Sequence, residues 1–251
     1  MQRYFHTFQY DGKFLSDLGA VIAQKPTFPK PEPDVEFVSL PGKSGDGISD
    51  NKRYKNVELL FKIRAVPAFC NLTVDEFSEK LSEWLQVGKC EYKEFRETYN
   101  KGYYRKAFCT KISDIIAVTK RVYEATITFN CEPFLYQVRG REELSYQTGV
   151  SSIALTNPEE WNALPILKVT GSGAFTISVN SNSFEITLNG TQITIDKPNE
   201  DVYYTNTGIS CNDKISALAL PYFQPGENII AISTESGTNF SMSIIPNWRR
   251  L

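Results

Sequence analysis

The segment Pro41-Gly42-Lys43-Ser44-Gly45-Asp46-Gly47 and the run Val57-Glu58-Leu59-Leu60-Phe61-Lys62-Ile63-Arg64 decide between two folds. Gly42-Lys43-Ser44 matches the end of a phosphate-binding loop, which requires a glycine five residues before its Gly-Lys pair and a helix after it. That earlier position is Phe37, and residues 57–64 alternate with the period of a strand. Both requirements fail. Residues 41–47 are therefore predicted to be a glycine-rich surface loop that feeds a strand, and no nucleotide or other cofactor is expected.

The composition bounds the chain to one large or two ordinary globular domains. It has 251 residues, of which 41% are hydrophobic, and its 27 basic residues nearly balance 29 acidic ones. This balance does not favour a nucleic-acid or anionic-membrane partner. The sequence holds no apolar run long enough to span a bilayer, and residues 1–6 lack the apolar core of a signal peptide. We expect a protein that stays in a cytoplasm at least until assembly or lysis, without membrane insertion.

Cysteine and histidine usage argues against catalytic and metal sites. Five cysteines, an odd number without CxxC spacing, favour small buried hydrophobes over a zinc site or a disulfide framework. The one histidine, His6, leaves little for a Ser-His-Asp or Cys-His mechanism. Hydrolysis by two carboxylates stays open on this ground, although no local pair of them stands out. We predict no catalytic and no metal-binding residue.

Residues 3–33 are predicted to form a hairpin and then an extended connector. Residues 3–9 and 18–24 flank the turn pair Asp11-Gly12. Four prolines follow within eight residues, which excludes a helix or a central strand and favours a polyproline-like conformation. They are Pro26, Pro29, Pro31 and Pro33. This arm could be a recognition peptide or a stiff segment that lies on a neighbouring subunit.

One long helix is predicted in an otherwise β-rich first half. Thr73-Val74-Asp75-Glu76 is a capping box, and an apolar stripe follows as far as Gly88, so we expect a helix from about 74 to 87. The stripe is Phe77, Leu81, Trp84 and Leu85. Strands are predicted at 36–40, 57–64, 89–95, 103–111 and 121–131. The last has an uncharged Thr/Asn face apart from Glu124, which would suit either a partner subunit or solvent.

The second half shows many short strands with turn signals close together, which is typical of an antiparallel β-sandwich. We expect a turn at Gly171-Ser172-Gly173 and a hairpin at Asn189-Gly190. The predicted strands are 165–169, 174–179, 184–188, 191–195, 202–205, 229–233 and 240–245. Residues 137–149 are polar without an apolar period. The predicted domains are therefore 1–133, a linker at 134–149, and 150–251.

Four motifs, in order, resemble one family. The loop Leu40-Pro41-Gly42-Lys43-Ser44-Gly45-Asp46 precedes Asn51, Tyr54, Asn56 and an alternating strand. Pro165-Ile166-Leu167-Lys168-Val169-Thr170-Gly171-Ser172-Gly173 opens the second half. Pro225-Gly226-Glu227-Asn228-Ile229-Ile230 and Ile245-Pro246-Asn247-Trp248-Arg249-Arg250-Leu251 close it. This set, which covers nearly the whole chain, resembles the distal tail (Dit) proteins of phages with long non-contractile tails.

The resemblance implies a fold and a role. The N-terminal domain would be a β-structure with one helix, six copies of which close into a ring that continues the tail tube. The C-terminal domain would be a galectin-like β-sandwich outside the ring. Implied partners are the tail tube protein, a tail-associated lysin or tail fibre, and a receptor-binding protein. DNA would only pass through, and the near-neutral charge is compatible with a wall that does not bind phosphates. The implied location is the tail tip of a virion assembled in a bacterial cytoplasm, in a phage, a prophage or a phage-derived particle.

A closed ring needs head-to-tail contacts, and the proline arm and glycine loop have the extended composition that such contacts use. The candidate subunit-interface residues are Pro29, Pro31, Pro41, Gly42, Gly45, Asp46 and Tyr54. The main rival function is a carbohydrate-binding or adhesion module, with Trp161 and Tyr222 as candidate ligand-stacking aromatics. The sugar-binding constellation of true galectins is built around histidine, which the second half lacks. A cell-wall glycosidase or peptidase is a further rival without a recognisable motif. The end 248–251 is either a docking tail or a terminal strand anchored by Trp248.

Overall fold

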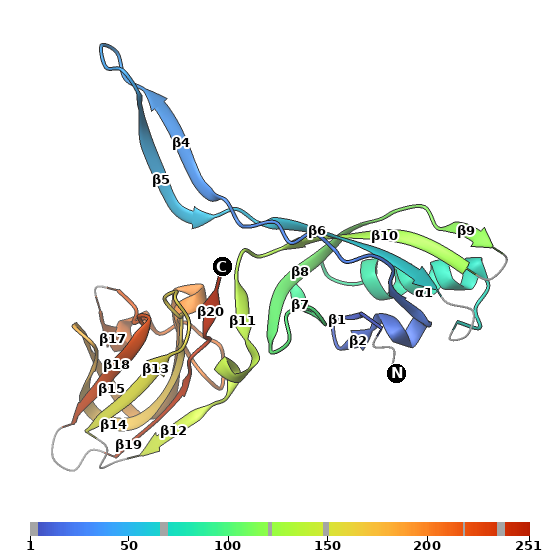
Figure 1. Cartoon of the computed structure of the whole chain (residues 1–251). Helices are drawn as coiled ribbons and strands as arrows, with labels where there is room; N and C mark the ends of the chain where they lie inside the picture. The colour runs from blue at the N-terminus through green and yellow to red at the C-terminus, as the bar shows by residue number, and fades with distance from the viewer. Residues whose placement is uncertain (1–4, 66–69, 120–121, 148–150, 218, 235–238) are drawn as a thin grey trace. The chain divides into compact units, whose positions relative to one another are not determined.

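The chain is described from a computed structural model that covers residues 5–65, 70–119, 122–147, 151–217, 219–234 and 239–251. It divides into two compact units, residues 1–135 with Leu251, and residues 136–250. Each unit is built almost wholly of antiparallel strands around its own apolar core (Figure 1). The predicted mainly β fold with one α-helix is confirmed for the described residues. No helix among them is both long and apolar enough to cross a membrane.

The main sheet of the first unit runs β2-β1-β7-β8-β10-β6-β3, with β9 also paired to β10. Its longest ladder joins β6 to β10 over nine residue pairs, from Tyr123–Ala65 to Cys131–Val57. Because the residues alternate, one face of each strand is buried and the other is not. The strands are β1 (Phe8–Tyr10), β2 (Lys13–Phe14), β3 (Ala20–Ile22), β6 (Val57–Ala65), β7 (Lys93–Glu97), β8 (Tyr103–Ile112), β9 (Ile116–Thr119) and β10 (Val122–Cys131).

The helix α1 (Val74–Gln86) has the predicted N-terminus and the predicted buried stripe. The Thr73 hydroxyl accepts from the Glu76 amide, and the Glu76 carboxylate accepts from the Thr73 amide at 2.8 Å. The stripe packs on the core face of the sheet, where the Trp84 indole N–H donates to the Tyr10 carbonyl at 3.0 Å. A buried indole thus finds the hydrogen-bond acceptor that its polar edge requires.

The hairpin predicted for residues 3–24 is wrong in its second strand. The turn Asp11-Gly12 joins β1 to the short β2, and β3 pairs instead with β6 on the opposite side of the sheet. Between them, the 3-10 helix Leu15–Leu18 buries Leu15 and ends at Gly19, whose φ of 67° is a left-handed conformation suited to glycine. This turn, anchored by Leu15, connects the two edges of the sheet. The predicted residues 3 and 4 lie outside the described residues.

The strands β4 (Pro33–Ser39) and β5 (Asp46–Tyr54) form a separate two-stranded sheet, which Figure 1 shows as a long hairpin. The glycine loop lies at its tip, as a turn between strands. Sequence reasoning missed β5, because its polar and glycine-containing stretch resembles a loop. Its ladder with β4 includes the pairs Phe37–Ile48 and Ser39–Asp46.

The second unit is organised on the long hairpin of β14 (Ile166–Val179) and β15 (Asn182–Asp196). The predicted turns at 171–173 and 189–190 are wrong, because these residues oppose one another inside the two strands at a register shift. There β14 changes partner from β19 (Phe240–Ile245) to β18 (Gly226–Thr234). Gly171 lies at this shift, where an added Cβ would come within 2.8 Å of the Asn239 carbonyl oxygen. Strands β13 (Ser152–Asn157), β16 (Asp201–Tyr204) and β17 (Ile215–Ser216) also belong to this unit.

The segment 134–149 was expected as a linker, and residues 148 and 149 lie outside the described part of the chain. Its described part contains β11 (Leu135–Gln137), a 3-10 helix (Val138–Arg141) and β12 (Leu144–Gln147), which pairs with β19. The polar composition of this segment did not indicate secondary structure, because only one face of β12 is covered. Gly140 lies against Trp248, since a Cβ on Gly140 would be 2.6 Å from the Trp248 nitrogen. Trp248 is buried against Phe223 and precedes β20 (Arg249–Arg250). The C-terminal segment is therefore a strand anchored by Trp248, the second of its two predicted forms.

Candidate assembly surfaces

The structure places the predicted interface residues at the two ends of the β4–β5 hairpin. Pro29 and Pro31 precede its base, while Pro41, Gly42 and Gly45 form the turn at its tip. Gly42 and Gly45 have φ values of 77° and 89°, which explains glycine at both positions. Asp46 opens β5 opposite Ser39. The predicted interface residues therefore fall into two separate groups, one at the base of the hairpin and one at its tip.

Tyr54 is a base residue with a structural contact. It ends β5 opposite Pro33, and its ring lies edge-on to Phe134 at a centroid distance of 6.2 Å. Beside it the Lys55 amide donates to the Glu32 carbonyl at 2.8 Å. Tyr54 is partly buried, unlike the residues of the tip. These contacts place Tyr54 where it fixes the start of the hairpin within its own chain.

The hairpin carries exposed apolar side chains that sequence reasoning did not select. Phe37 and Ile48 are directly opposite each other and are each 68% exposed. Val38 and Leu40 are also exposed. Together they form an exposed apolar strip on the hairpin, and larger patches of this kind are a feature of interaction surfaces. The sequence does contain a signal for this pair: the apolar Phe37-Val38 stands on one side of the glycine loop and the apolar Ile48 on the other.

Polar contacts stiffen the hairpin without burying it. Arg53 Nε donates to the Asp34 carboxylate at 2.6 Å, and this hydrogen bond is the main reason that the pKa of Asp34 is lowered. Near it, the Lys52 amide donates to Asp50 Oδ1 at 2.7 Å, which supports Lys52 in a left-handed conformation with φ of 55°. An Asx-type contact of this kind is a local turn device. These contacts link the base of the hairpin while its strands keep no buried residue.

The proline arm comprises residues 23–32, because Pro33 is already the first residue of β4. It runs beside β6 and lines a groove on the outward face of the sheet. The Ala23 amide donates to the Lys62 carbonyl at 2.8 Å at one end, and the Lys55–Glu32 bond ties the other. Phe28 anchors the arm by packing against Tyr99, with a centroid distance of 5.9 Å. The groove is lined by Gln24, Lys25, Pro26, Thr27, Pro29, Glu58, Leu60, Lys62 and Thr126. Its neighbour, lined among others by Arg64, Ile116 and Glu124, shares Gln24, Lys62 and Thr126 with it.

The outward face of β6 and β10 is polar and largely self-paired. Arg64 lies opposite Glu124 and its Nε donates to Glu124 Oε1 at 2.7 Å. Further along, the Tyr92 hydroxyl lies 2.9 Å from Asn130 Oδ1 and accepts from Asn56 Nδ2 at 2.6 Å. Leu60, which is 52% exposed, is the large apolar side chain on the outward face of β6. This face therefore pairs Arg64 with Glu124 and leaves one large apolar position beside the proline arm.

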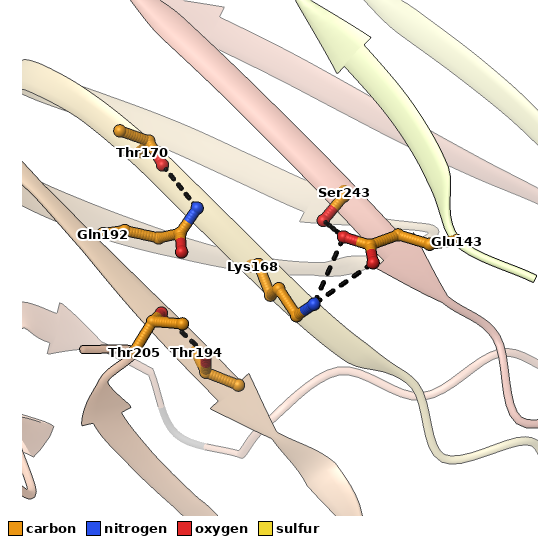
Figure 2. A network of polar contacts seen from close by, with 7 residues as sticks. All are labelled: Glu143, Lys168, Thr170, Gln192, Thr194, Thr205 and Ser243. Atoms are coloured by element: carbon orange, nitrogen blue, oxygen red, sulfur yellow. Dashed lines mark hydrogen bonds and ion pairs between the residues drawn. The ribbon is translucent and has the colours of Figure 1, made fainter. Parts of the chain in front are cut away.

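The second unit has a polar sheet face of its own, shown in Figure 2. Lys168 donates to both oxygens of Glu143 at 3.1 and 3.3 Å, and the Ser243 hydroxyl donates to the same carboxylate. The Ser243 and Lys168 hydrogen bonds, in that order, lower the pKa of Glu143. Across the sheet, Gln192 donates to Thr170 and the Thr194 and Thr205 hydroxyls bond to each other at 2.8 Å. Hydrogen bonds among these side chains therefore account for the polar character of this sheet face.

The predicted stacking aromatics, Trp161 and Tyr222, lie on neighbouring segments of the second unit. The bridge between Ala163 and Phe223 holds these segments together. Trp161 is half-buried and its carbonyl accepts from the Asn157 amide group at 2.8 Å, while Tyr222 is 39% exposed. Tyr222 is thus the accessible member of the pair.

Among the described residues, two buried thiols and His6 have structural surroundings. Burial raises the pKa of the Cys109 thiol to about 11 and that of Cys131 to about 12, so both stay protonated at neutral pH. His6 stacks on Tyr99 at a centroid distance of 4.2 Å, and its Nδ1 is 3.2 Å from the Thr98 hydroxyl. Within the described ranges, no cluster of three or more His, Cys, Asp or Glu residues could hold a metal ion.

No protein-family model matches the chain, and no curated protein matches its sequence. Its structure is similar to the crystal structure of the SPP1 Dit protein (gp 19.1), presented as a paradigm of the hub adsorption apparatus in phages that infect Gram-positive bacteria. The match has a TM-score of 0.71 at 12% sequence identity and covers 99% of this chain and 100% of that one. At this identity the likeness establishes the fold: the chain has a Dit-like fold.

Proposed function

We propose that this chain is a distal tail protein, a structural component that forms a hub ring at the tip of a long, non-contractile phage tail. The observation that carries the proposal is the fold similarity to SPP1 Dit, which extends over both units at a TM-score of 0.71. Fold alone does not fix function, so the exposed surfaces must be consistent with assembly. The hairpin, with its accessible Phe37 and Ile48, meets that condition.

In this proposal six copies close head-to-tail, through two different surfaces of each copy. The proline arm and the hairpin tip supply these contacts, with Pro29, Pro31, Pro41, Gly42, Gly45 and Asp46 among their residues. Tyr54 contributes by holding the hairpin base. The ring continues the tail tube and lets DNA pass. Its role is non-enzymatic, without cofactor or membrane insertion, and measurable cell-wall hydrolysis by the pure protein would contradict it.

The proposed partners are the tail tube protein on one side and a tail-associated lysin or tail fibre on the other. A receptor-binding protein could dock on the second unit. The proposed location is the virion tail tip, after assembly in the bacterial host cytoplasm. These partners and this location follow from the proposed hub role, and evidence against that role would also contradict them.

The test is the solution mass of the purified protein by light scattering, with negative-stain images of the same fraction. We expect a species of six chains of 28.4 kDa each, with a central hole. A monomer at every concentration, both alone and mixed with the tail tube protein of the same phage, would overturn the ring. A solid particle without a hole would contradict the hub geometry even if the mass were right.

Carbohydrate binding by the second unit is a second candidate, favoured by the exposed ring of Tyr222 beside the Trp161 segment. An exposed aromatic ring can stack on a sugar face. The test is a glycan array probed with the whole chain and with Tyr222→Ala. Tyr92→Ala, which removes an exposed tyrosine of the first unit, is the matched control. Binding that Tyr222→Ala abolishes and Tyr92→Ala leaves intact would support this function, and no binding to any glycan would dismiss it.

A further inference from the structure

We propose that strand β13 of the second unit pairs with β13 of a second copy, antiparallel and about a twofold axis, so that the two sheets become continuous. The inference goes beyond the proposed ring, because ring contacts are head-to-tail whereas this contact uses the same surface of both copies. The strand Ser152–Asn157 reads Ser-Ile-Ala-Leu-Thr-Asn, without a charged residue or a proline.

Strand β13 is an edge strand whose open side is not protected. Within the described residues it pairs only with β18. The other edges of this unit are protected: the acidic Glu143 stands directly before β12, and β17 has only two residues. The open side of β16 is covered by residues 209–211, since the Tyr204 amide donates to the Ile209 carbonyl at 2.9 Å. Charge, coverage and shortness are devices that keep edge strands from pairing with other chains, and β13 shows none of them.

The backbone groups on the open side of β13 belong to Ser152, Ala154 and Thr156. Opposite residues of an antiparallel pair alternate between those that exchange hydrogen bonds and those that do not. The Ile232 amide donates to the Ser151 carbonyl at 2.9 Å, so the odd-numbered residues of this segment bond to β18. The even-numbered residues therefore direct their N–H and C=O groups to the open side. All three of them are exposed.

The contacts of Ile229 show the same alternation at the centre of the strand. Ile229 lies opposite Ala154 in the ladder with β18. Its amide donates to the Asn180 side-chain oxygen at 3.0 Å, and its carbonyl accepts from the Asn180 amide at 2.8 Å. Because both backbone groups of Ile229 are used on the side away from β13, those of Ala154 point to the open side of the sheet.

One register of self-pairing uses all of these groups. When Ala154 lies opposite Ala154 of the second copy, Ser152 lies opposite Thr156 of that copy, and both pairs can exchange hydrogen bonds. Pairing centred on Leu155 would instead place Ser152 opposite Pro158, which has no N–H to donate. The sequence therefore selects the register centred on Ala154.

The side chains agree with this register. Because opposite residues share a face, Ile153 would lie beside Leu155 of the second copy on the core face. Leu155 is only partly buried in the single chain, although it packs against the core, and the pairing would cover it. On the outer face, the hydroxyl residues Ser152 and Thr156 would lie opposite each other. A second copy is thus the occupant that satisfies both the backbone and the side chains.

Cysteine cross-linking of the full chain tests this contact. All variants carry Cys90→Ser, which removes the exposed natural cysteine. Ala154→Cys should form a disulfide-linked dimer under mild oxidation, because opposite bonding residues have Cα atoms about 5.5 Å apart. Ala231→Cys is the matched control, since Ala231 is also exposed and lies on the same face one strand further in. We expect Ala154→Cys to dimerise at least about tenfold faster than this control, given the distance that a disulfide requires. Equal rates would overturn the proposal.

A mixed experiment tests the register. A tagged copy with Ser152→Cys should link to an untagged copy with Thr156→Cys. Ser152→Cys alone should link poorly, because its two copies would lie about 14 Å apart along the strands. Efficient linking of Ser152→Cys to itself, or failure of the mixed pair to link, would contradict the antiparallel arrangement.

A charge on the open edge supplies an independent measurement. Ala154→Lys should raise the dissociation constant of the twofold contact about tenfold or more, because edge lysines prevent strand pairing. Ala231→Lys should leave this constant unchanged, and sedimentation velocity measures both variants. Equal association of the two variants would overturn the proposal. Loss of the six-copy species in the unmodified protein, with the Ala154→Cys disulfide still formed, would contradict the proposed ring and support this contact.

Discussion

The β6–β10 pair and the β4–β5 hairpin are both long antiparallel ladders, yet they use their side chains in opposite ways. The first buries every second residue, so that Phe61 and Phe129 lie in a core of aromatic rings 6.1 Å apart. The second buries no side chain, and its directly opposite apolar pair, Phe37 and Ile48, is exposed. A ladder of hydrogen bonds therefore gives a strand its shape, and only a covered face gives it stability. Within the described residues, no second layer covers the hairpin.

Replacing a phenylalanine by alanine in each of the two ladders should give the largest difference in the free energy of unfolding. Phe61→Ala removes a fully buried ring and should cost about 3–5 kcal/mol of the free energy of unfolding. Phe37→Ala removes an exposed ring and should change it by less than about 0.5 kcal/mol in the monomer. Urea unfolding followed by tryptophan fluorescence measures both. A comparable loss from Phe37→Ala would mean that the hairpin is covered within its own chain.

Glycine substitutions extend the contrast to the backbone. Gly140→Ala places a Cβ 2.6 Å from the Trp248 nitrogen and should destabilise the second unit by about 1–3 kcal/mol. Gly47→Ala is the matched control in the hairpin, where the nearest atoms would be 3.6 Å away, and it should be nearly neutral. Thermal unfolding of the two variants measures the difference. Equal melting temperatures would show that the Trp248 segment shifts without cost.

The helix cap tests a local device that does not depend on a distant partner. Thr73→Ala removes the hydroxyl that accepts from the Glu76 amide and should cost about 0.5–2 kcal/mol. Thr73→Ser keeps the oxygen and should cost much less. Urea midpoints at neutral pH distinguish the two variants. If serine does not restore the midpoint, the methyl group rather than the cap accounts for the loss.

The smallest effect is expected at the polar face of the second unit. The pKa of Glu143 is lowered by Ser243 and Lys168, so its contribution to stability is present above its ordinary pKa of 4.5 and is lost as the pH falls through the lowered value. Because the pair is partly exposed, Glu143→Gln should cost less than about 1 kcal/mol at pH 7. The melting-temperature difference from the unmodified chain should shrink towards pH 3. A constant difference would point to altered packing instead.

The sequence by itself determined the elements whose signals are local. The capping box at Thr73 and Glu76 and the stripe from Phe77 to Leu85 specified α1, because a helix needs only neighbours three and four residues apart. The alternation in residues 57–64 and 121–131 specified β6 and β10 for a similar reason. The ordered motifs specified the Dit-like fold, although no single one of them was specific.

Only the tertiary structure decided which strands pair and which faces are covered. Gly171 and Gly190 read as turns, yet they lie inside β14 and β15, because glycine also suits a register shift where β14 changes partner. Likewise, β3 pairs with β6 through contacts more than forty residues apart in the chain. The exposure of Phe37 and Ile48 could not be predicted from the sequence either, because the hydrophobicity of a strand does not reveal whether another layer will cover its side chains. The physical reason is common to all three: pairing and burial are set by partners distant in sequence, which local patterns do not encode.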